Sequence, residues 1–379
     1  MPIGNTKKIG SGINLTGFKN LSGLIEEITT FFSTTKKIEM KKSFLLYFID
    51  IVGTCNLRCP SCPVGNYQAN DFIGNKRPKG FMEFALFKEI LDKIKRENTN
   101  DEKVVIGMYN WGEPLLHPDL PQFVEAIQAK GFYAEISTNL NVKDVREVVI
   151  AAPNKLIVSL SGYDYNIYSQ THKRGNPHLV VSNLFKLRYY MEKLKKQFIV
   201  EASYHLYKHN VGKDIERIIY ITKDLGFRFS SDLTLLMPLE KNLKYQNGEP
   251  LSQPDQAIVS LMLIHPDEQV KLAQPYKLMD CPLQDWMTIN FDGSTALCCA
   301  VYDYQYNVAD NFLDVSQVEL DKRKKRHPYC IKCMNKGLHI VASFTARTEL
   351  NNLINERLAA IGSHFRRNNS HSRLQLCNQ

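Results

Sequence analysis

The sequence of 379 residues predicts an α/β fold built on a parallel sheet. Three observations support this prediction. Six short apolar runs are rich in β-branched and aromatic residues, amphipathic segments with helical spacing separate them, and the two kinds of segment alternate. Strands joined through helical crossovers pair in parallel, and in such folds the loops at the carboxyl ends of the strands carry the chemistry.

The alternating segments occupy residues 44–240. The apolar run 44–52 predicts a strand, and 82–96 predicts a helix because Phe87, Leu91 and Ile94 fall on one helical face. The further expected elements are strands at 104–108, 133–137, 156–160, 198–206 and 227–237, and helices at 120–129, 144–152, 179–194 and 211–225.

Changes in composition divide the chain into five expected parts. Before residue 44 there is one short amphipathic segment, 21–32. After residue 240, four prolines break any long element, and five of the nine cysteines follow between 281 and 335. We therefore expect a leader with one helix at 1–43, a core at 44–240, a connector at 241–280, a cysteine-rich domain at 281–362 and a polar, disordered tail at 363–379.

The composition also limits the partners and the location of the protein. The formal charge of +9 is scattered, and its densest run, 322–326, is expected to be a solvated loop or helix end without any nucleic-acid-binding motif. Nucleic acid is therefore not expected as a partner. No apolar stretch reaches the roughly 18 residues of a membrane span, and no signal peptide is visible, so we expect a cytoplasmic protein. Nine cysteines then favour metal or redox chemistry over disulfides.

The first cysteine motif follows the first expected strand. Cys55, Cys59 and Cys62 are spaced CxxxCxxC, and three thiolates on one loop can hold three irons of a [4Fe–4S] cluster. The fourth iron then has no protein ligand and can bind a small chelating molecule. The alternatives are a zinc site, which normally has four ligands from paired motifs, or buried cysteines without metal.

In this motif the sequence resembles the radical S-adenosylmethionine (radical SAM) superfamily. The resemblance implies that the open iron binds the amino and carboxylate groups of S-adenosylmethionine. One electron from the cluster, supplied by an external reductant of the flavodoxin or ferredoxin type, then breaks a carbon–sulfur bond. The 5′-deoxyadenosyl radical released in this way abstracts a hydrogen atom from the substrate. The resemblance also implies a partial (β/α)6 barrel.

Further motifs follow the second, third and fourth expected strands, where this family has its cofactor contacts. Asn110-Trp111-Gly112-Glu113-Pro114 is similar to the family's Gly-Gly-Glu-Pro motif, with Trp111 in place of the first glycine. Ser61 stands where many relatives have an aromatic residue near the adenine. The resemblance implies cofactor-binding roles for Gly112, Glu113, Pro114, Ser137, Asn139, Ser159 and Arg174.

The second cysteine set comprises Cys281, Cys298, Cys330 and Cys333, with a β-hairpin expected around Asp292-Gly293. Four thiolates can hold zinc or a second [4Fe–4S] cluster. The spacing resembles the start of the SPASM extension of radical SAM enzymes, and the absence of its later cysteines resembles the shorter twitch domain, a β-hairpin plus a helix. A cluster with four cysteine ligands has no open iron, which favours an electron relay and net oxidation of the substrate.

Two residues near the second set are candidate catalytic residues. Cys299 directly follows Cys298, and its thiol could donate a hydrogen atom to a substrate radical, as in radical epimerases. Asp303 is an acid–base candidate, whereas Cys377, in the polar tail, is expected to be a spectator. The sequence leaves four functions open: oxidation of a polar small molecule or peptide, epimerisation, peptide crosslinking, and a non-catalytic zinc or iron–sulfur protein.

Overall fold

The computed structural model describes residues 44–66, 79–98 and 102–367. The chain divides into two units, residues 1–42 and 43–379, and all described residues belong to the second. The helix expected at 21–32 and the spectator Cys377 lie outside the described residues.

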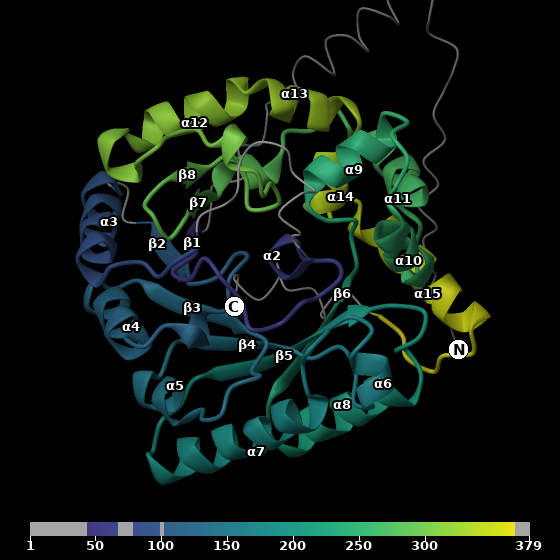
Figure 1. Cartoon of the computed structure of the whole chain (residues 1–379), viewed down its shortest axis with the longest axis horizontal. Coiled ribbons are helices and arrows are strands. Elements are labelled where there is room, and N and C mark those ends of the chain that lie inside the picture. The colour runs from purple at the N-terminus through teal and green to yellow at the C-terminus, as the bar shows by residue number, and fades with distance from the viewer. Residues whose placement is uncertain (1–43, 67–78, 99–101, 368–379) are drawn as a thin grey trace, which may run out of the picture. The chain divides into compact units, whose positions relative to one another are not determined.

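An eight-stranded sheet forms the centre of the described unit, in the order β6-β5-β4-β3-β2-β1-β7-β8. The first six strands are parallel and follow one another in chain order, which confirms the predicted α/β class and the partial (β/α)6 barrel (Figure 1). Their bounds are β1 Phe44–Ile49, β2 Lys103–Gly107, β3 Tyr133–Thr138, β4 Lys155–Ser159, β5 Ile199–Leu206 and β6 Arg228–Leu233.

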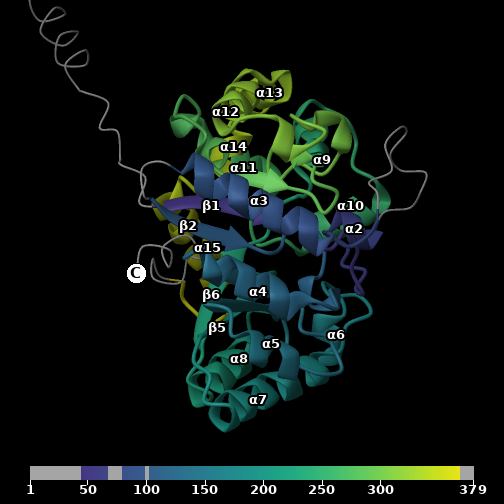
Figure 2. The same cartoon turned by 90° about the vertical axis from the view of Figure 1, so that its left-hand side faces the viewer.

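Helices cover the outer face of this curved sheet, and Figure 2 shows α3, α4 and α5 stacked one above the other on that side. Neighbouring helices also pack against each other. Phe87 of α3 and Phe123 of α4 are fully buried, with ring centroids 4.5 Å apart. Full burial of such a side chain contributes about 1.5–3 kcal/mol. The crossover helices are α3 Phe84–Glu97, α4 Leu120–Ala129, α5 Arg146–Ala151, α7 Pro177–Lys193 and α8 Lys213–Asp224.

The expected hairpin is present and extends the same sheet. Its strands are β7 Met287–Ile289 and β8 Thr295–Ala296, joined through Gly293, whose φ of 86° suits glycine. β7 pairs in parallel with β1, so the cysteine-rich region is fixed beside the loop that carries the first cysteine motif. Two helices, α12 Gln317–Arg326 and α13 Pro328–Asn335, follow the hairpin.

The segment expected as a proline-broken connector is largely helical, because its prolines begin helices. Pro254 lies in the first turn of α10 (Gln253–Leu261), and Pro266 is the first residue of α11 (Pro266–Ala273). Proline fits the first turn, where its missing N–H has no helical partner to lose. A third helix, α9 Leu239–Gln246, precedes these two.

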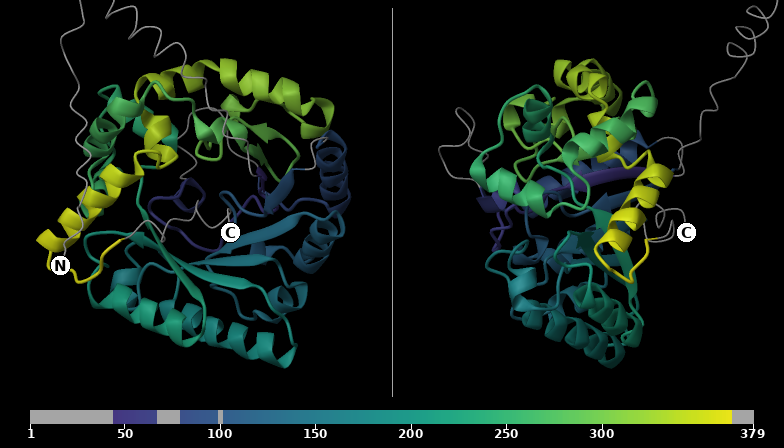
Figure 3. Two further views of the ribbon diagram at one scale, coloured as in Figure 1. Left: turned by 180° about the vertical axis from the view of Figure 1, so that it is seen from behind. Right: turned by 90° about the vertical axis from the view of Figure 1, so that its right-hand side faces the viewer.

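The C-terminal part also differs from the expected disordered tail. After α15 (Arg347–Ala360), residues 363–367 pack against the barrel edge at β6, and Ser363, Phe365 and Arg367 are buried. The Arg367 guanidinium donates to the backbone carbonyl of Ser231 at 3.0 Å. Figure 3 shows α15 running along the side of the molecule, where it packs against α11. No helix within the described ranges has the length and apolarity required to cross a bilayer.

Candidate active site

A cavity of about 490 Å³ lies at the carboxyl ends of the barrel strands. Its wall combines residues from the loops after β1, β2, β3 and β4 with residues of the cysteine-rich region. Three of the expected metal ligands and five of the expected cofactor-binding residues line it: Cys55, Cys59, Cys62, Gly112, Glu113, Ser137, Asn139 and Ser159. Parallel strands bring these motifs together because their carboxyl ends share one edge of the sheet.

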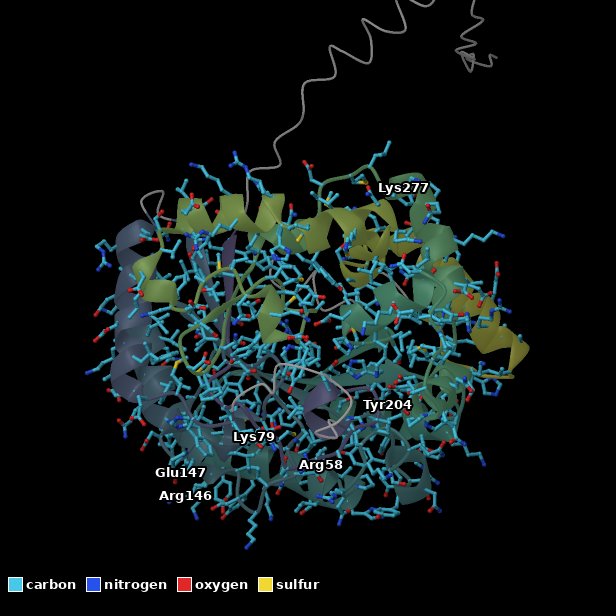
Figure 4. The ribbon with its side chains drawn as sticks, turned by 45° about the horizontal axis from the view of Figure 1, so that its top comes forward. Arg58, Lys79, Arg146, Glu147, Tyr204 and Lys277 are labelled. Carbon is cyan, nitrogen blue, oxygen red and sulfur yellow. The ribbon has the colours of Figure 1, made fainter. Side chains whose placement is uncertain are left out.

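The cysteine loop is held by hydrogen bonds to its sulfur atoms and its backbone. The backbone N–H of Leu57 and the side-chain amide of Asn139 donate to Cys55 Sγ at 3.4 and 3.6 Å. The backbone N–H of Arg58, labelled in Figure 4, donates to the carbonyl of Lys173 at 2.9 Å. Donors directed at ligand sulfur are typical of iron–sulfur sites.

Burial controls the protonation of these thiols. It raises the pKa of Cys55 to about 12 and holds the pKa of Cys59 well above its usual value. At neutral pH these thiols are therefore protonated without metal, and each becomes a thiolate when a cationic metal centre replaces its proton. Three thiols on one loop, with N–H donors near the sulfur, fit three irons of a [4Fe–4S] cluster.

Glu113 links the loops after β2 and β3. Its carboxylate is buried and accepts from the hydroxyl of Thr138 at 2.6 Å and from the backbone N–H groups of Asn139 and Leu115 at 2.8 and 3.1 Å. Burial raises the pKa of Glu113 to about 7 against these three donors. A cationic ligand beside Glu113 would stabilise its ionised form, so the carboxylate can accept a hydrogen bond from an ammonium group.

Asp50, at the end of β1, is a site-forming residue that the motifs did not reveal. Its buried carboxylate accepts from the backbone N–H groups of Trp111 and Gly112, both at 3.1 Å. The backbone N–H of Glu113 donates to the carbonyl of Thr54 at 2.9 Å. These bonds join the glycine-containing loop to the cysteine loop. The signal in the sequence was a single charged residue inside an apolar strand.

Gly112 allows this close approach. A Cβ atom at that position would lie 1.6 Å from the carbonyl oxygen of Val52. Real Cβ atoms do not approach backbone oxygen so closely, and neither segment can move without breaking the hydrogen bonds to Asp50. Glycine is therefore required at this position for a steric reason.

The expected residues Pro114 and Arg174 are not among the cavity-lining residues. Pro114 is buried in the short 3₁₀ helix that follows Glu113. Arg174 is exposed and has a φ of 71°, in the loop that contacts the cysteine loop through the carbonyl of Lys173. Its backbone is thus close to the motif, whereas its side chain is on the solvent side.

Two further wall residues come from outside the motifs. His172 is buried and stacked on Tyr168, with ring centroids 4.5 Å apart, and burial lowers its pKa to about 3. Tyr207, just after β5, bonds through its hydroxyl with Ser61 of the cysteine loop and with Thr234. The period-2 pattern of β5, which puts residues 203, 205 and 207 on one side, was the signal that could have identified Tyr207.

The second cysteine set lies around a smaller cavity. Cys281, Cys298, Cys330 and Cys333 all line it, together with apolar residues such as Leu283, which lines both cavities. Cys330 and Cys333 are one turn apart on α13 and so share a face. Burial raises the pKa of Cys281 to about 12 and of Cys330 to about 11. This donor set fits a metal centre whose cation replaces the thiol protons.

Among the residues that the structure describes, no three Cys, His, Asp or Glu side chains gather as ligands of a single metal ion would. The thiolates of a [4Fe–4S] cluster bind different irons, so their sulfur atoms lie farther apart than the ligands of one ion.

Lys324 departs from the expectation for the basic run, which is otherwise exposed on α12. Its side chain is fully buried, and its ammonium donates to the backbone carbonyl of Gln284 at 2.9 Å and to that of Trp286. The lysine therefore ties α12 to the segment between Cys281 and β7. A run of like charges gives no sign that one member points inward.

The two candidate catalytic residues have different positions. Cys299 lines the main cavity and packs against the inner apolar group of Leu46, Phe48 and Val105. Asp303 does not line it: its carboxylate accepts from the backbone N–H of Gln305 at 3.0 Å and caps a 3₁₀ helix. The structure thus brings Cys299, but not Asp303, to the wall that also holds the first cysteine motif.

Comparison with known proteins agrees with this geometry. Residues 49–242, more than half of the chain, match the Radical SAM superfamily. The chain belongs to this superfamily, whose members are enzymes, and membership implies a [4Fe–4S] cluster and S-adenosylmethionine. A curated relative, the tungsten-containing aldehyde ferredoxin oxidoreductase cofactor-modifying protein of Pyrococcus furiosus, is 30% identical over 92 residues. That match spans 24% of this chain and 23% of the relative.

Solved structures with similar folds are remote in sequence. Native anSMEcpe with bound AdoMet has a TM-score of 0.49 at 14% identity, covering 85% of this chain and 100% of that chain. SuiB of Streptococcus suis bound to precursor peptide SuiA has a TM-score of 0.46 at 16% identity, covering 86% and 75%. BtrN in complex with AdoMet and 2-DOIA has a TM-score of 0.44 at 14% identity, covering 79% and 89%.

Proposed function

We propose that this chain is a radical SAM enzyme that removes a hydrogen atom from a polar small molecule or peptide and completes a net oxidation, by dehydrogenation or bond formation. The observation that carries the proposal is the single cavity in which Cys55, Cys59 and Cys62 meet Glu113 and the ends of β3 and β4. Cluster and S-adenosylmethionine together supply a 5′-deoxyadenosyl radical when bound.

The protein's own residues position these groups. Cys55, Cys59 and Cys62 hold three irons, and Glu113 accepts from the cofactor's ammonium. Ser137, Asn139 and Ser159 contribute hydrogen-bonding groups to the same wall, and Arg174 is available from the adjoining loop. Both apolar or aromatic residues and polar or charged residues line the rest of the cavity.

Product analysis tests this proposal. The full chain, reconstituted with iron and sulfide without oxygen and then reduced with dithionite, is expected to convert S-adenosylmethionine to 5′-deoxyadenosine and methionine. Protein fully loaded with iron that yields no 5′-deoxyadenosine would contradict the proposal.

We assign Cys281, Cys298, Cys330 and Cys333 to an auxiliary [4Fe–4S] cluster of the SPASM/twitch type. The support is their common cavity, which shares Leu283 with the main cavity. Four cysteine ligands leave no open iron, so this centre is suited to accept an electron from a substrate radical. That role favours net oxidation.

Removal of one auxiliary ligand tests this assignment. Cys333→Ala is expected to lower the iron content from about eight to about four per chain, because each [4Fe–4S] cluster contributes four irons. Cys377→Ala, outside both motifs, is the matched control and should keep full iron, as measured by colorimetric iron assay and metal analysis. A loss of about one zinc per chain, with iron unchanged, would identify a zinc site instead.

Epimerisation is the second candidate function, and the position of Cys299 favours it. Cys299 lines the main cavity, where a substrate radical would form, and its thiol also bonds with the sulfur of Cys298. The chemistry would be transfer of the sulfur-bound hydrogen atom to the substrate carbon.

Isotope incorporation separates the two candidates. If the enzyme is an epimerase, turnover in deuterium oxide should give a product of unchanged composition with one deuterium, and Cys299→Ala should abolish it. If the enzyme oxidises its substrate, the product should be lighter by two hydrogens without solvent deuterium, and Cys299→Ala should still form it. Mass spectrometry of the product distinguishes these outcomes.

We also infer an external one-electron reductant of the flavodoxin or ferredoxin type, because the proposed reaction consumes an electron at the first cluster. A cytoplasmic location is part of the proposal, because seven cysteines used as metal ligands suit a reducing compartment. The proposal also keeps the radical SAM core at 44–240 and the auxiliary-cluster domain at 281–362.

A further inference from the structure

The inner wall of the barrel carries acidic residues below the motif residues. Side chains two residues apart on a strand point the same way, so Glu135 lies below Ser137 on β3, and Asp232 on β6 lies below Thr234, the residue just after that strand. All four line the cavity. Within the described part of its lining, the charged residues are Glu113, Glu135 and Asp232, and there is no lysine or arginine. A chain with a net charge of +9 thus has an acidic cavity.

Two cationic side chains, Lys155 and Arg367, neutralise only part of the negative charge of the acidic residues in this wall. Glu135 and Glu201 share one lysine, Lys155, whose Nζ lies 3.7 and 3.1 Å from their carboxylates. Asp232 has Arg367 at 3.4 Å. Three carboxylates therefore face two cations, all of them largely buried. A buried surplus charge is costly unless a partner of opposite sign compensates it.

An independent observation is a buried hydroxyl on β5, between the register of Glu135 and that of Asp232. Ser203 is 1% exposed, and its hydroxyl finds no hydrogen-bond partner among the described residues. It points to the same side of β5 as His205, which lines the cavity, and is in register with Ser159 and Ser230 on the neighbouring strands. Buried hydroxyls in native proteins nearly always have a partner. A bound polar molecule would supply it.

An aromatic wall lies beside Glu135, whose carboxylate also accepts from the hydroxyl of Tyr109. The ring of Phe48 makes edge contacts with Tyr109 and Trp286, at centroid distances of 5.3 and 5.8 Å. Trp111 also lines the cavity, so both tryptophans of the chain belong to this wall. Aromatic rings attract cations through the negative potential of their faces.

We propose that the barrel interior binds a substrate that carries positively charged amino or guanidino groups, for which Glu135, beside the aromatic wall, and Asp232, on β6, are two separate carboxylate partners. This inference rests on the proposed function, because it names the substrate class of that enzyme. Glu135 and Asp232 lie deeper than Ser137 and Thr234, so their site is separate from the ammonium partner assigned to Glu113.

Calorimetric titration of three probes tests the proposal on the reconstituted full chain, saturated with S-adenosylmethionine and without reductant. The probes are 1,6-diaminohexane, 1,6-hexanediol and adipate, which share a six-carbon chain and differ in charge. The diamine is expected to bind at least about tenfold more tightly than the diol, and adipate more weakly than either. Glu135→Gln and Asp232→Asn should each weaken diamine binding about tenfold. Asp92→Asn, which removes an exposed carboxylate on α3, is the matched control and should not.

Equal affinity for the diamine and the diol would overturn the inference, as would absence of diamine binding. Diamine binding that neither Glu135→Gln nor Asp232→Asn weakens would place the cation elsewhere and would also overturn it. The proposed function fails by a different result, namely no 5′-deoxyadenosine from the reduced wild-type protein. If 5′-deoxyadenosine forms while diamine and diol bind alike, only the cation-binding inference is lost.

Discussion

Replacing Cys59 with alanine is expected to abolish 5′-deoxyadenosine formation and to reduce the iron content from about eight to about four per chain. Two thiolates cannot hold the first cluster, and no further cysteine lines the loop side of the cavity among the described residues. The auxiliary cysteines are on other elements, so their cluster should persist. Iron analysis and product chromatography of the reconstituted variant measure both effects.

This variant forms a reciprocal pair with Cys333→Ala. Both should lose about half of the iron, but only Cys59→Ala should lose reductive cleavage of S-adenosylmethionine in the absence of substrate. Cys377→Ala serves again as the unaffected cysteine control. If Cys59→Ala still cleaved the cofactor, the assignment of the first cluster to the loop 55–62 would be wrong.

Gly112→Ala should be the most damaging substitution outside the cysteines. The added Cβ would lie 1.6 Å from the Val52 carbonyl oxygen and 3.0 Å from Asp50 Oδ1, so the two loops must separate. We expect a loss of about 3 kcal/mol or more in the free energy of unfolding, the upper range for overpacking. The melting temperature should fall by about 4 °C or more. Affinity for S-adenosylmethionine should fall as well, because Glu113 moves with the loop.

Gly212→Ala is the control for this substitution. A Cβ at Gly212 meets nothing within 4 Å, but its backbone, at φ −94° and ψ −129°, lies outside the main regions that L residues adopt. Alanine there should therefore cost about 1–3 kcal/mol through backbone strain and a weaker helix cap, without forcing two segments apart. Anaerobic thermal melts and cofactor titrations of both variants measure the difference. Only Gly112→Ala should lower affinity for S-adenosylmethionine, and unchanged affinity in that variant would show that the loops at Gly112 do not have to separate.

Local patterns explain why much of the barrel could be predicted from the sequence. The alternation of apolar runs and helical spacing located β1 to β6, and the position of Cys55, Cys59 and Cys62 after the first run located the site. Because the carboxyl ends of parallel strands share one edge of the sheet, Glu113 and Asn139 were expected at one cavity. These features depend on residues close in sequence or on the rule that parallel strands end together.

The parts that were missed depend on long-range contacts. The pairing of β7 with β1 joins residues about 240 positions apart, and no local pattern encodes it. Asp50 and Lys324 are buried because backbone groups far along the chain accept or donate their hydrogen bonds. Composition alone classed Lys324 as solvated and residues 363–367 as a disordered tail. Arg367 is ordered because it meets the backbone of Ser231 and the carboxylate of Asp232.

The central claim is that three thiolates leave one iron open for S-adenosylmethionine. Electron–nuclear double resonance of the reduced wild-type protein tests it most directly, with cofactor labelled by ¹⁵N in the amino group and ¹⁷O in the carboxylate. The account predicts hyperfine coupling of both labels to the reduced cluster, and loss of both couplings in Cys59→Ala. A reduced cluster without coupling to either label, at saturating cofactor, would contradict it.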